Sequence, residues 1–421
     1  MCHVCAASDL AVVTEQPILE ALQFLAVIPL SASTMYRTIR LALSDFPTTP
    51  TSLRKIPAVD EAKEEIDIDL ANLFHHYYND KHGKVPPDPD PVQFEHLQYL
   101  TTDKEFRVQG SGLGPTSASR RAHSNELGHA FCRLFLHDHL NITYFAHIEH
   151  VLRWGALNKF GNVKVERIGP GDTPDYFCAD HTNAIFLAEA KGRHSAINFA
   201  NAGFASWREQ FNTVLVTDAS GSPCSVKGFI VATRFATESK PNTKSVLYAE
   251  DPLTPGERSL SPDDTPRLRR AVVSLHYADI ASKLNQPILA DALLQGYAVP
   301  EEIRFLGTVW TLRVGPFAGT RFVGGYYPTG GGPVTAREVD GQIVFGGADP
   351  LRLDVDFGTF FGVEEKIFKQ VAGLARGAQT TAPEIGQFDQ IQPFYSAVSI
   401  LRDGSTIGPL EFFTPTAPGT Y

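Results

Sequence analysis

The chain has 421 residues, of which 43% are hydrophobic and 20% charged, and its formal net charge is −10. This length and composition allow a large core and predict two or three domains. No apolar run is long enough to span a membrane, the N-terminus lacks the pattern of a signal peptide, and the five cysteines are scattered. We therefore expect a cytoplasmic protein with no membrane partner.

The acidic charge is unevenly distributed. Residues 1–103 contain 7 Lys or Arg against 15 Asp or Glu, whereas residues 104–234 contain 14 against 11. A nucleic-acid-binding protein needs only a local basic groove, because phosphate contacts are short-range at physiological salt. The charge distribution therefore permits a nucleic-acid partner without arguing for one.

The first hundred residues are predicted to be mainly helical. Apolar residues recur at helical spacing over residues 18–26, and less clearly over residues 39–43. Cys2 and Cys5 have the spacing of zinc ligands, but no second such pair completes a four-ligand site. The acidic run 60–69 is interpreted as a solvated helix face, or else as a nucleic-acid mimic that restrains a basic site.

A linker or long surface loop is predicted at residues 79–91, because four prolines exclude both a helix and a central strand. A second loop is expected at residues 109–119, where glycine and serine are frequent. Between the two loops, residues 94–99 are predicted to form a short helix. This part of the chain separates the N-terminal region from the next long helix.

The helix that begins near residue 124 is predicted to have an apolar stripe and a polar face. The residues of the polar face are Glu126, His129, Arg133 and His137. Arg120 and Arg121, just upstream, are candidates for contacts to phosphate. Six histidines lie between residues 123 and 150, but without an HExxH pattern. Exposed or capping histidines are therefore favoured over a zinc cluster or a histidine base.

The central feature of the sequence is a predicted β-hairpin at residues 171–193. Turn residues 180–183 separate two strands, and the second strand is an apolar run that ends in Glu-Ala-Lys-Gly. Residues two apart in a strand point to the same face, so Glu189 and Lys191 point together. Pairing across the turn is expected to bring Asp175 level with Glu189.

Two carboxylates and an ammonium at one point suit the hydrolysis of a phosphodiester. Hard cations such as Mg²⁺ bind one or two carboxylates together with substrate phosphate oxygens. The metal offsets charge at the phosphate and helps to form hydroxide, and a lysine beside it orients that water or steadies the developing charge. The alternative is a surface hairpin with solvated charges, against which the apolar strand argues.

Asp175, followed fourteen residues later by Glu189-x-Lys191, resembles the signature of the PD-(D/E)xK nuclease superfamily. That superfamily includes restriction endonucleases and many repair and defence nucleases. The resemblance covers residues 120–235 and implies a restriction-endonuclease-like α/β core, a mixed sheet flanked by helices. It also implies Mg²⁺-dependent phosphodiester hydrolysis, with Mn²⁺ as a substitute. Asp175 and Glu189 would hold the metal, and Lys191 would orient the water or help to deprotonate it.

The resemblance implies roles for further residues. Glu126 lies on what resembles the first core helix, which often supplies another acidic residue to the metal site; the alternative is a surface glutamate favoured by the helix dipole. Residues 195–211 are read as a helix broken near Gly203. Some exonuclease-like branches carry a Gln followed four residues later by Tyr in this helix, but here Gln210 is followed by Val214. The candidate substrate-binding residues are Arg120, Arg121, Arg193 and Gln210.

The rest of the chain is predicted to be of mixed α and β structure. Residues 226–235 are expected to form a further core strand, and residues 271–295 look helical. Past residue 303, segments rich in glycine and aromatic residues indicate short strands and tight turns. The glycine runs lack the Lys-Ser or Lys-Thr of a phosphate loop. This region is interpreted as a target-recognition module, an oligomer interface or a partner-docking surface.

The predicted fold class is α/β, with three regions. These are a mainly helical region at 1–103, a nuclease core at 104–250 and an accessory α+β region at 251–421. The predicted function is a Mg²⁺-dependent deoxyribonuclease with a role in restriction or antiphage defence, as a homodimer or with a partner protein. Two alternatives stay open: a latent nuclease that a partner or signal activates, and an inactive nucleic-acid-binding or scaffold component.

Overall fold

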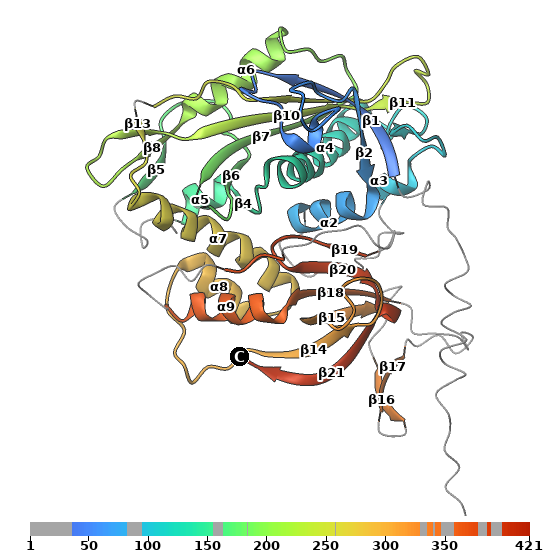
Figure 1. Cartoon of the computed structure of the whole chain (residues 1–421), viewed down its shortest axis with the longest axis vertical. Coiled ribbons are helices and arrows are strands. Elements are labelled where there is room, and N and C mark those ends of the chain that lie inside the picture. The colour runs from blue at the N-terminus through green and yellow to red at the C-terminus, as the bar shows by residue number, and fades with distance from the viewer. Residues whose placement is uncertain are drawn as a thin grey trace, which may run out of the picture.

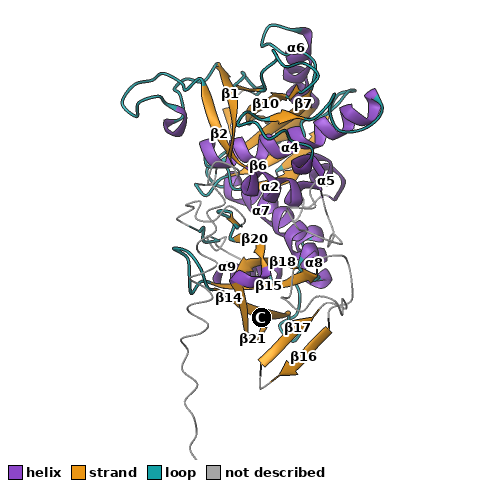
Figure 2. Ribbon diagram, turned by 90° about the vertical axis from the view of Figure 1, so that its right-hand side faces the viewer, coloured by secondary structure: helices purple, strands orange, loops and turns teal. Residues whose placement is uncertain are grey.

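The computed structural model has two β-sheets with helices between them (Figure 1). It describes residues 36–81, 95–154, 163–182, 184–256, 258–328, 335–339, 342–346, 358–377, 385–388 and 398–421. In the view turned by 90°, helices α4, α2 and α7 again lie between the sheets (Figure 2). The chain is thus a mixed α/β protein with a mixed sheet flanked by helices and a β-rich C-terminal region.

The larger sheet has seven strands in the order β2-β1-β12-β10-β7-β6-β4. Their bounds are β1 (Tyr36–Ser44), β2 (Glu65–Asp69), β4 (Tyr144–His147), β6 (Tyr176–Ala179), β7 (Ile185–Arg193), β10 (Lys227–Arg234) and β12 (Val246–Glu250). Strand β10 runs parallel to β7, and β1 runs parallel to β12. The other neighbouring pairs are antiparallel. Two of the strands precede residue 103 and five follow it.

Helices cover both faces of this sheet. The described helices are α2 (Leu70–Lys81), α3 (Glu95–Gln98), α4 (Ser117–Leu140), α5 (Ile148–Trp154), α6 (Ala202–Gln210), α7 (Asp264–Lys283), α8 (Pro287–Gln295) and α9 (Glu365–Ala375). Gly192 of β7 abuts α4, whereas the guanidinium of the next residue, Arg193, stacks on Trp207 of α6. Because successive strand residues point to opposite faces, α4 and α6 lie on opposite sides of β7 (Figure 1).

Local sequence sets the ends of the two helices next to the hairpin. The Thr116 side chain caps α4 by accepting a hydrogen bond from the Ser119 amide, and Asn141 ends that helix in the left-handed region, with φ of 57°. Asp69 starts α2 in the same way, because its carboxylate accepts hydrogen bonds from the amides of Ala71 and Asn72. Both helices therefore begin at defined positions.

Smaller sheets flank the core. A four-stranded sheet has the order β13-β9-β8-β5, and β3 pairs with β11. The bounds are β3 (Arg107–Val108), β5 (Lys164–Arg167), β8 (Val214–Thr217), β9 (Pro223–Ser225), β11 (Ala236–Thr237) and β13 (Arg258–Ser259).

The C-terminal region forms a six-stranded sheet in the order β19-β20-β18-β15-β14-β21. The bounds are β14 (Leu306–Leu312), β15 (Arg321–Pro328), β18 (Gly358–Glu364), β19 (Ser399–Ile400), β20 (Ser405–Pro409) and β21 (Phe413–Thr420). A separate hairpin consists of β16 (Thr335–Val339) and β17 (Gln342–Gly346). The short strands expected past residue 303 are present.

A buried polar network joins this C-terminal sheet to α2 and α7. The two ring nitrogens of His75 lie 2.9 Å from Ser399 Oγ and 3.1 Å from Ser405 Oγ. His276 Nε2 lies 2.9 Å from Asp403 Oδ2, and the Ser405 hydroxyl donates to the other oxygen of that carboxylate at 2.6 Å. All five side chains are buried. The network therefore fixes the C-terminal region against α2.

The prediction of helix in the N-terminal region is wrong at two places. Residues 39–43 lie in strand β1, and the acidic run 60–69 ends in strand β2. In β2 the isoleucines at 66 and 68 are buried while Glu65 and Asp67 are exposed, which is the alternation of a strand rather than the face of a helix. The helical spacing at 18–26 and the Cys2–Cys5 pair lie outside the described residues.

Other predicted boundaries shift as well, and α4 begins at Ser117, inside the predicted loop 109–119, rather than near residue 124. Residues 79–81 belong to α2 rather than to a loop, and the remainder of the 79–91 segment lies outside the described residues. The second core helix begins only at residue 202, where Asn201 caps it. Residues 271–295 are split between α7 and α8, because Asn285 takes a left-handed φ of 54° and Pro287 begins a new helix. Among the described residues, no helix is long and apolar enough to span a membrane.

Candidate active site

The hairpin of β6 and β7 brings the two predicted carboxylates together. Tyr176 pairs with Ala188, so the next position along the register places Asp175 beside Glu189. Asp175 Oδ2 also accepts a hydrogen bond from the Ala190 amide at 2.8 Å. The side chain of Asp175 is therefore held against β7 by the backbone of that strand.

Lys191 completes the group. Its ammonium contacts Glu189 Oε1 and lies 3.6 Å from Asp175 Oδ2. Glu189 and Lys191 point to the face of β7 away from α4, because Gly192 between Lys191 and Arg193 is the residue that abuts α4. The three side chains thus meet at one point on the sheet.

Burial makes Glu189 unusual. Its side chain has no exposed surface, and its pKa is raised well above the usual value, by burial and then by the charge of Asp175, with Lys191 opposing. Burial also disfavours the charged form of Lys191, but the two carboxylates outweigh it and raise the pKa of Lys191. Lys191 therefore keeps its ammonium at neutral pH.

One oxygen of Glu189 is left without a partner. Oε1 contacts the ammonium of Lys191, whereas Oε2 accepts no hydrogen bond from the described part of the chain. A buried carboxylate oxygen with no partner is costly, since most buried polar atoms in proteins are hydrogen-bonded. A cation bound between Glu189 and Asp175 would remove this cost, so the residues fit a divalent metal with oxygen ligands.

A third carboxylate, Asp80 at the end of α2, lies next to this group. Tyr176 donates a hydrogen bond to Asp80 Oδ1 at 2.5 Å. Arg133 Nη1 and His147 Nε2 each lie 3.3 Å from the same oxygen, and His129 Nδ1 lies 3.6 Å from Oδ2. Asp80 is therefore the centre of a network that draws on α2, α4, β4 and β6.

His129 links this network to the motif. Its Nδ1 lies 2.8 Å from the hydroxyl of Tyr176, and its Nε2 lies 3.7 Å from Asp175 Oδ1. Because the Tyr176 proton goes to Asp80, the Tyr176 oxygen accepts the hydrogen bond from His129 Nδ1. The sequence does not predict this series of contacts from Asp80 through Tyr176 and His129 to Asp175, because Asp80 falls in a segment expected to be a loop and the histidines are expected to be exposed.

The structure places Glu126 in a different cluster. Its carboxylate accepts a hydrogen bond from Lys81 Nζ at 2.8 Å and lies 3.5 Å from His96 Nε2 and 3.6 Å from His123 Nδ1. His129, one turn further along α4, reaches Asp175 instead. The helix predicted to support the motif does so, but through a histidine.

The predicted phosphate ligands lie in three settings. The guanidinium of Arg120 donates to two backbone carbonyls of the preceding loop, at 3.1 and 3.2 Å. Arg193 stacks on Trp207, with 4.6 Å from its central carbon to the ring centre, and its pKa is lowered by burial and by the nearby charge of Arg121. Gln210 is buried, and its Oε1 has no hydrogen-bond partner among the described residues.

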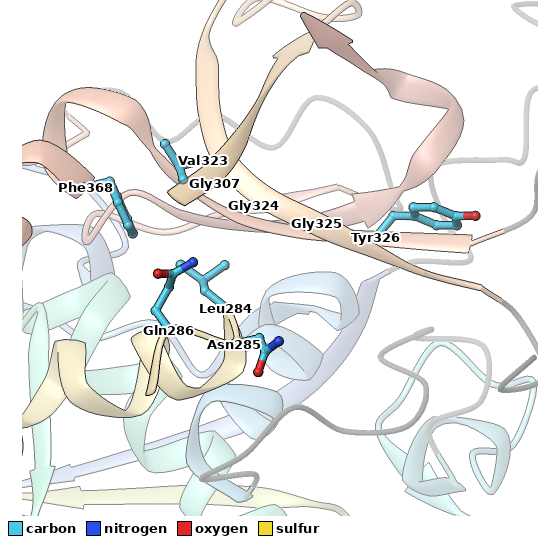
Figure 3. Close-up of a pocket in the computed structure, with 9 residues that line it drawn as sticks. All are labelled: Leu284, Asn285, Gln286, Gly307, Val323, Gly324, Gly325, Tyr326 and Phe368. Carbon is cyan, nitrogen blue, oxygen red and sulfur yellow. The ribbon is translucent and has the colours of Figure 1, made fainter. Parts of the chain in front are cut away.

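A hollow of about 410 Å³ lies away from this group, between the α7–α8 junction and the C-terminal sheet (Figure 3). Its lining residues are Leu284, Asn285, Gln286, Gly307, Val323, Gly324, Gly325, Tyr326 and Phe368. This lining has amide and aromatic groups but no charged side chain, so it does not suit the binding of a phosphate group by charge. We assign it no part in hydrolysis.

Comparisons of the chain with known protein families, curated proteins and solved structures find no match. The chemistry of the site is therefore inferred from its own residues. The most restrictive feature is a fully buried glutamate beside a second carboxylate and a lysine, a combination that suits the binding of a cation.

Proposed function

We propose that the chain is a metal-dependent nuclease of the PD-(D/E)xK type that hydrolyses phosphodiester bonds of DNA. The observation that carries this proposal is the convergence of Asp175, Glu189 and Lys191, with one Glu189 oxygen buried and unpartnered. A solvated surface hairpin would not bury Glu189 completely, so that alternative explains the site less well.

The order of elements around the motif supports the same proposal. Helix α4 is followed by β4, β6 and β7, which pair as an antiparallel meander. Helix α6 then leads to β10, which pairs in parallel with β7. The superfamily resemblance implies this succession of helix, strand meander, helix and strand. Helix α5 and the strands β5, β8 and β9 are inserted between these elements.

Asp175 and Glu189 are the residues that would hold the metal. When bound, Mg²⁺ supplies positive charge at the scissile phosphate and lowers the pKa of water. Asp175 is oriented for this by the Ala190 amide and by His129. Asp80 already has four partners, so we assign it to positioning His129 and Tyr176 rather than to the metal.

Lys191 acts as a hydrogen-bond donor in this proposal. Its raised pKa keeps the ammonium charged, so it orients the attacking water or stabilises negative charge at the phosphate rather than accepting a proton. Arg193 and Arg121 lie close together and supply positive charge near the end of β7. We propose that these two arginines meet the DNA backbone, while Arg120 holds the loop before α4.

The test is cleavage of supercoiled plasmid by the purified chain with Mg²⁺, Mn²⁺ or EDTA. We expect nicking or linearisation that needs metal and falls roughly 100-fold or more in Glu189→Gln and Lys191→Ala. The first substitution weakens the hold on the metal, and the second removes positive charge at the reacting phosphate. His181→Ala is the control, since His181 lies exposed in the hairpin turn. Circular dichroism of each variant checks that the fold is kept.

Three outcomes separate the alternatives. Cleavage by the wild type that persists in both variants would exclude Asp175, Glu189 and Lys191 as the active site. DNA binding without cleavage, unchanged by Asp175→Asn, would favour an inactive binding or scaffold component. Cleavage that appears only with a partner protein or signal, and is lost in Glu189→Gln, would identify a latent nuclease with the same site.

A further inference from the structure

Three side chains outside the proposed active site meet with the spacing of metal ligands. They are His96 of α3 and His123 and Glu126 of α4. One carboxylate oxygen, Glu126 Oε2, lies 3.5 Å from His96 Nε2 and 3.6 Å from His123 Nδ1. The two imidazole rings are 5.6 Å apart and inclined at 72°, so their nitrogens approach the carboxylate from different directions.

These distances match a tetrahedral metal site. Zinc binds histidine nitrogen and carboxylate oxygen at about 2.0–2.2 Å, and the edge of a tetrahedron with such bonds is about 3.4 Å. The two observed separations are within a few tenths of an ångström of that edge. All three ligand atoms lie within 4.8 Å of one another, so a bound metal would draw the group together.

The hydrogen-bond partners of the ligands also suit a metal. The Glu126 carboxylate accepts a hydrogen bond from Lys81 Nζ at 2.8 Å, on the oxygen that faces both rings. His123 Nδ1 is buried and makes no hydrogen bond within the described part of the chain.

The ammonium of Lys81 occupies the position beside Glu126 that a metal would take. Its ammonium lies 2.8 Å from Glu126 Oε2, the same oxygen that both histidines approach. The side chain of Lys81 is 37% exposed, so it can turn into solvent when a metal binds. A hollow of about 10 Å³, room for one water molecule, also borders the rings of His96 and His123.

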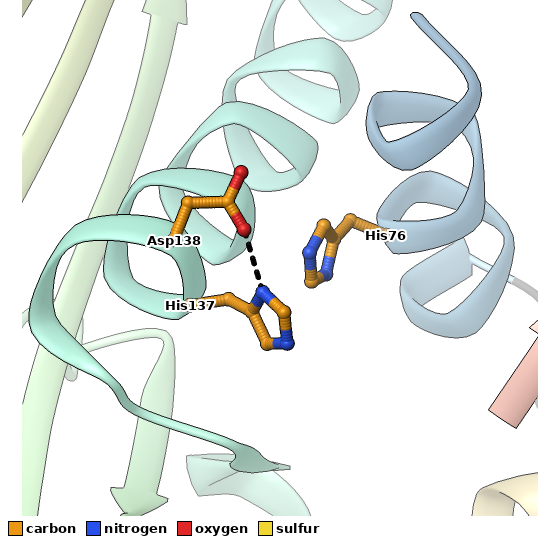
Figure 4. A group of neighbouring side chains, drawn as sticks. All are labelled: His76, His137 and Asp138. Carbon is orange, nitrogen blue, oxygen red and sulfur yellow. Dashed lines mark hydrogen bonds and ion pairs between the residues drawn. The ribbon is translucent and has the colours of Figure 1, made fainter. Parts of the chain in front are cut away.

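A second group of possible ligands, His76, His137 and Asp138, is a weaker candidate (Figure 4). Both ring nitrogens of His137 are already used, one by Asp138 at 2.7 Å and the other by the amide of Arg402 at 3.3 Å. Only His76 has its ring nitrogens unpartnered among the described residues. One free imidazole does not make a metal site.

We propose that His96, His123 and Glu126 bind a transition-metal ion of the Zn²⁺ type, displacing Lys81, at a site separate from Asp175 and Glu189. Two imidazoles and one carboxylate form a ligand set that zinc uses with water in the fourth position. Imidazole nitrogen selects such metals over Mg²⁺. The bound metal would tie α3 to α4 beside the end of α2, which bears Asp80 as well as Lys81.

The experiment measures metal binding rather than cleavage. The full chain, treated with EDTA and dialysed, is titrated with Zn²⁺ by calorimetry and with Co²⁺ by visible absorption, which reports tetrahedral coordination. We expect affinity to fall at least ~100-fold in His123→Ala and Glu126→Gln, since loss of even an outer partner costs 10–100-fold. Glu189→Gln and His181→Ala should bind as the wild type does.

Lys81→Met gives an independent test, because it removes the competing ammonium at a half-exposed position. We expect this variant to bind Zn²⁺ about 10-fold more tightly than the wild type, because the ammonium no longer competes for the Glu126 carboxylate. The proposal is overturned if the wild type binds no Zn²⁺, or if binding is unchanged in both His123→Ala and Glu126→Gln. It is equally overturned if Lys81→Met weakens binding. None of these readouts depends on nuclease activity.

Discussion

The register between β6 and β7 places the carboxylates of Asp175 and Glu189 side by side. Burial of the Glu189 carboxylate there is unfavourable. Glu189 is sealed from solvent, and its neighbours supply one ammonium for two acidic groups. The pair was predictable because both residues lie in one hairpin, where period-two alternation and the turn position fix which side chains meet. Asp80 was not predictable, since it lies 95 residues before Asp175 and directly precedes a proline-rich segment.

Asp80→Asn tests whether Asp80 is a positioning residue. The amide keeps the shape but loses the charge that faces Arg133, which is buried. We expect the free energy of unfolding to fall by about 1–3 kcal/mol, with cleavage reduced less than in Glu189→Gln. Urea unfolding and plasmid cleavage measure the two effects. A variant as stable as the wild type but as inactive as Glu189→Gln would make Asp80 a metal ligand instead.

The close contact between α4 and β7 fixes the motif strand against its supporting helix. A Cβ at Gly128 would lie 2.4 Å from the Gly192 amide nitrogen, and one at Gly192 would lie 1.8 Å from the Ser124 carbonyl oxygen. Neither position has room for a side chain, because the obstacles are backbone atoms. His129 and Glu126 are thus carried on a helix whose distance from β7 is set by two glycines.

Gly128→Ala is expected to force α4 away from β7. Overpacking of this kind costs about 1–3 kcal/mol or more, and the shift should also separate His129 from Asp175 and reduce cleavage. Gly373→Ala in α9 is the matched control, because a Cβ there meets nothing within 4 Å and alanine favours a helix by up to about 1 kcal/mol. Thermal unfolding of both variants decides the matter; equal melting temperatures would contradict the proposed contact.

Elements with a strong local pattern were predicted well, whereas elements defined by distant partners were not. Residues 226–235 match β10 closely, and the helix expected near residue 124 is present as α4, although it begins earlier, at Ser117. The apolar spacing of residues 39–43 predicts a helix, whereas these residues form strand β1, which pairs with β2 and with β12, two hundred residues later. In β2, the buried isoleucines at 66 and 68 alternate with acidic residues on the exposed face, so the sequence looks like a solvated acidic run rather than a strand.

At the scale of the whole molecule, α7 is the element that joins the two sheets. It packs near β4 and β6 on one side, and its last residue, Lys283, is fully buried against α2. The ammonium of Lys283 donates a hydrogen bond to the carbonyl of Asn79 at 3.2 Å, and burial lowers the pKa of Lys283 to about 8. Helix α7, through Lys283, therefore helps to fix the end of α2 and with it Asp80.

The lowered pKa of Lys283 in the folded chain predicts that the free energy of unfolding depends on pH. The unfolded chain binds the Lys283 proton up to its ordinary pKa of 10.5, while the folded chain releases it near pH 8, so this residue makes stability rise with pH between the two values. Lys283→Met should be more stable than the wild type at neutral pH, by about 1–3 kcal/mol.

The difference between Lys283→Met and the wild type should shrink as the pH approaches 10.5. Urea unfolding at neutral pH and near that upper value measures the difference directly. Other titrating groups are common to both proteins, so their effects largely cancel. A difference that does not change with pH would show that the lysine is not held in a low-pKa state.

The parallel pairing of β1 with β12 determines which fragments of the chain can fold. A fragment beginning at residue 104 would contain every residue of the Asp175 motif, yet it would leave the β12 edge as an open strand, a template for aggregation. It would also lack Asp80, so the buried Arg133 would lose its carboxylate partner. Expression trials and limited proteolysis should therefore recover a soluble core only when Tyr36–Lys81 is retained, although the signature lies more than ninety residues further on.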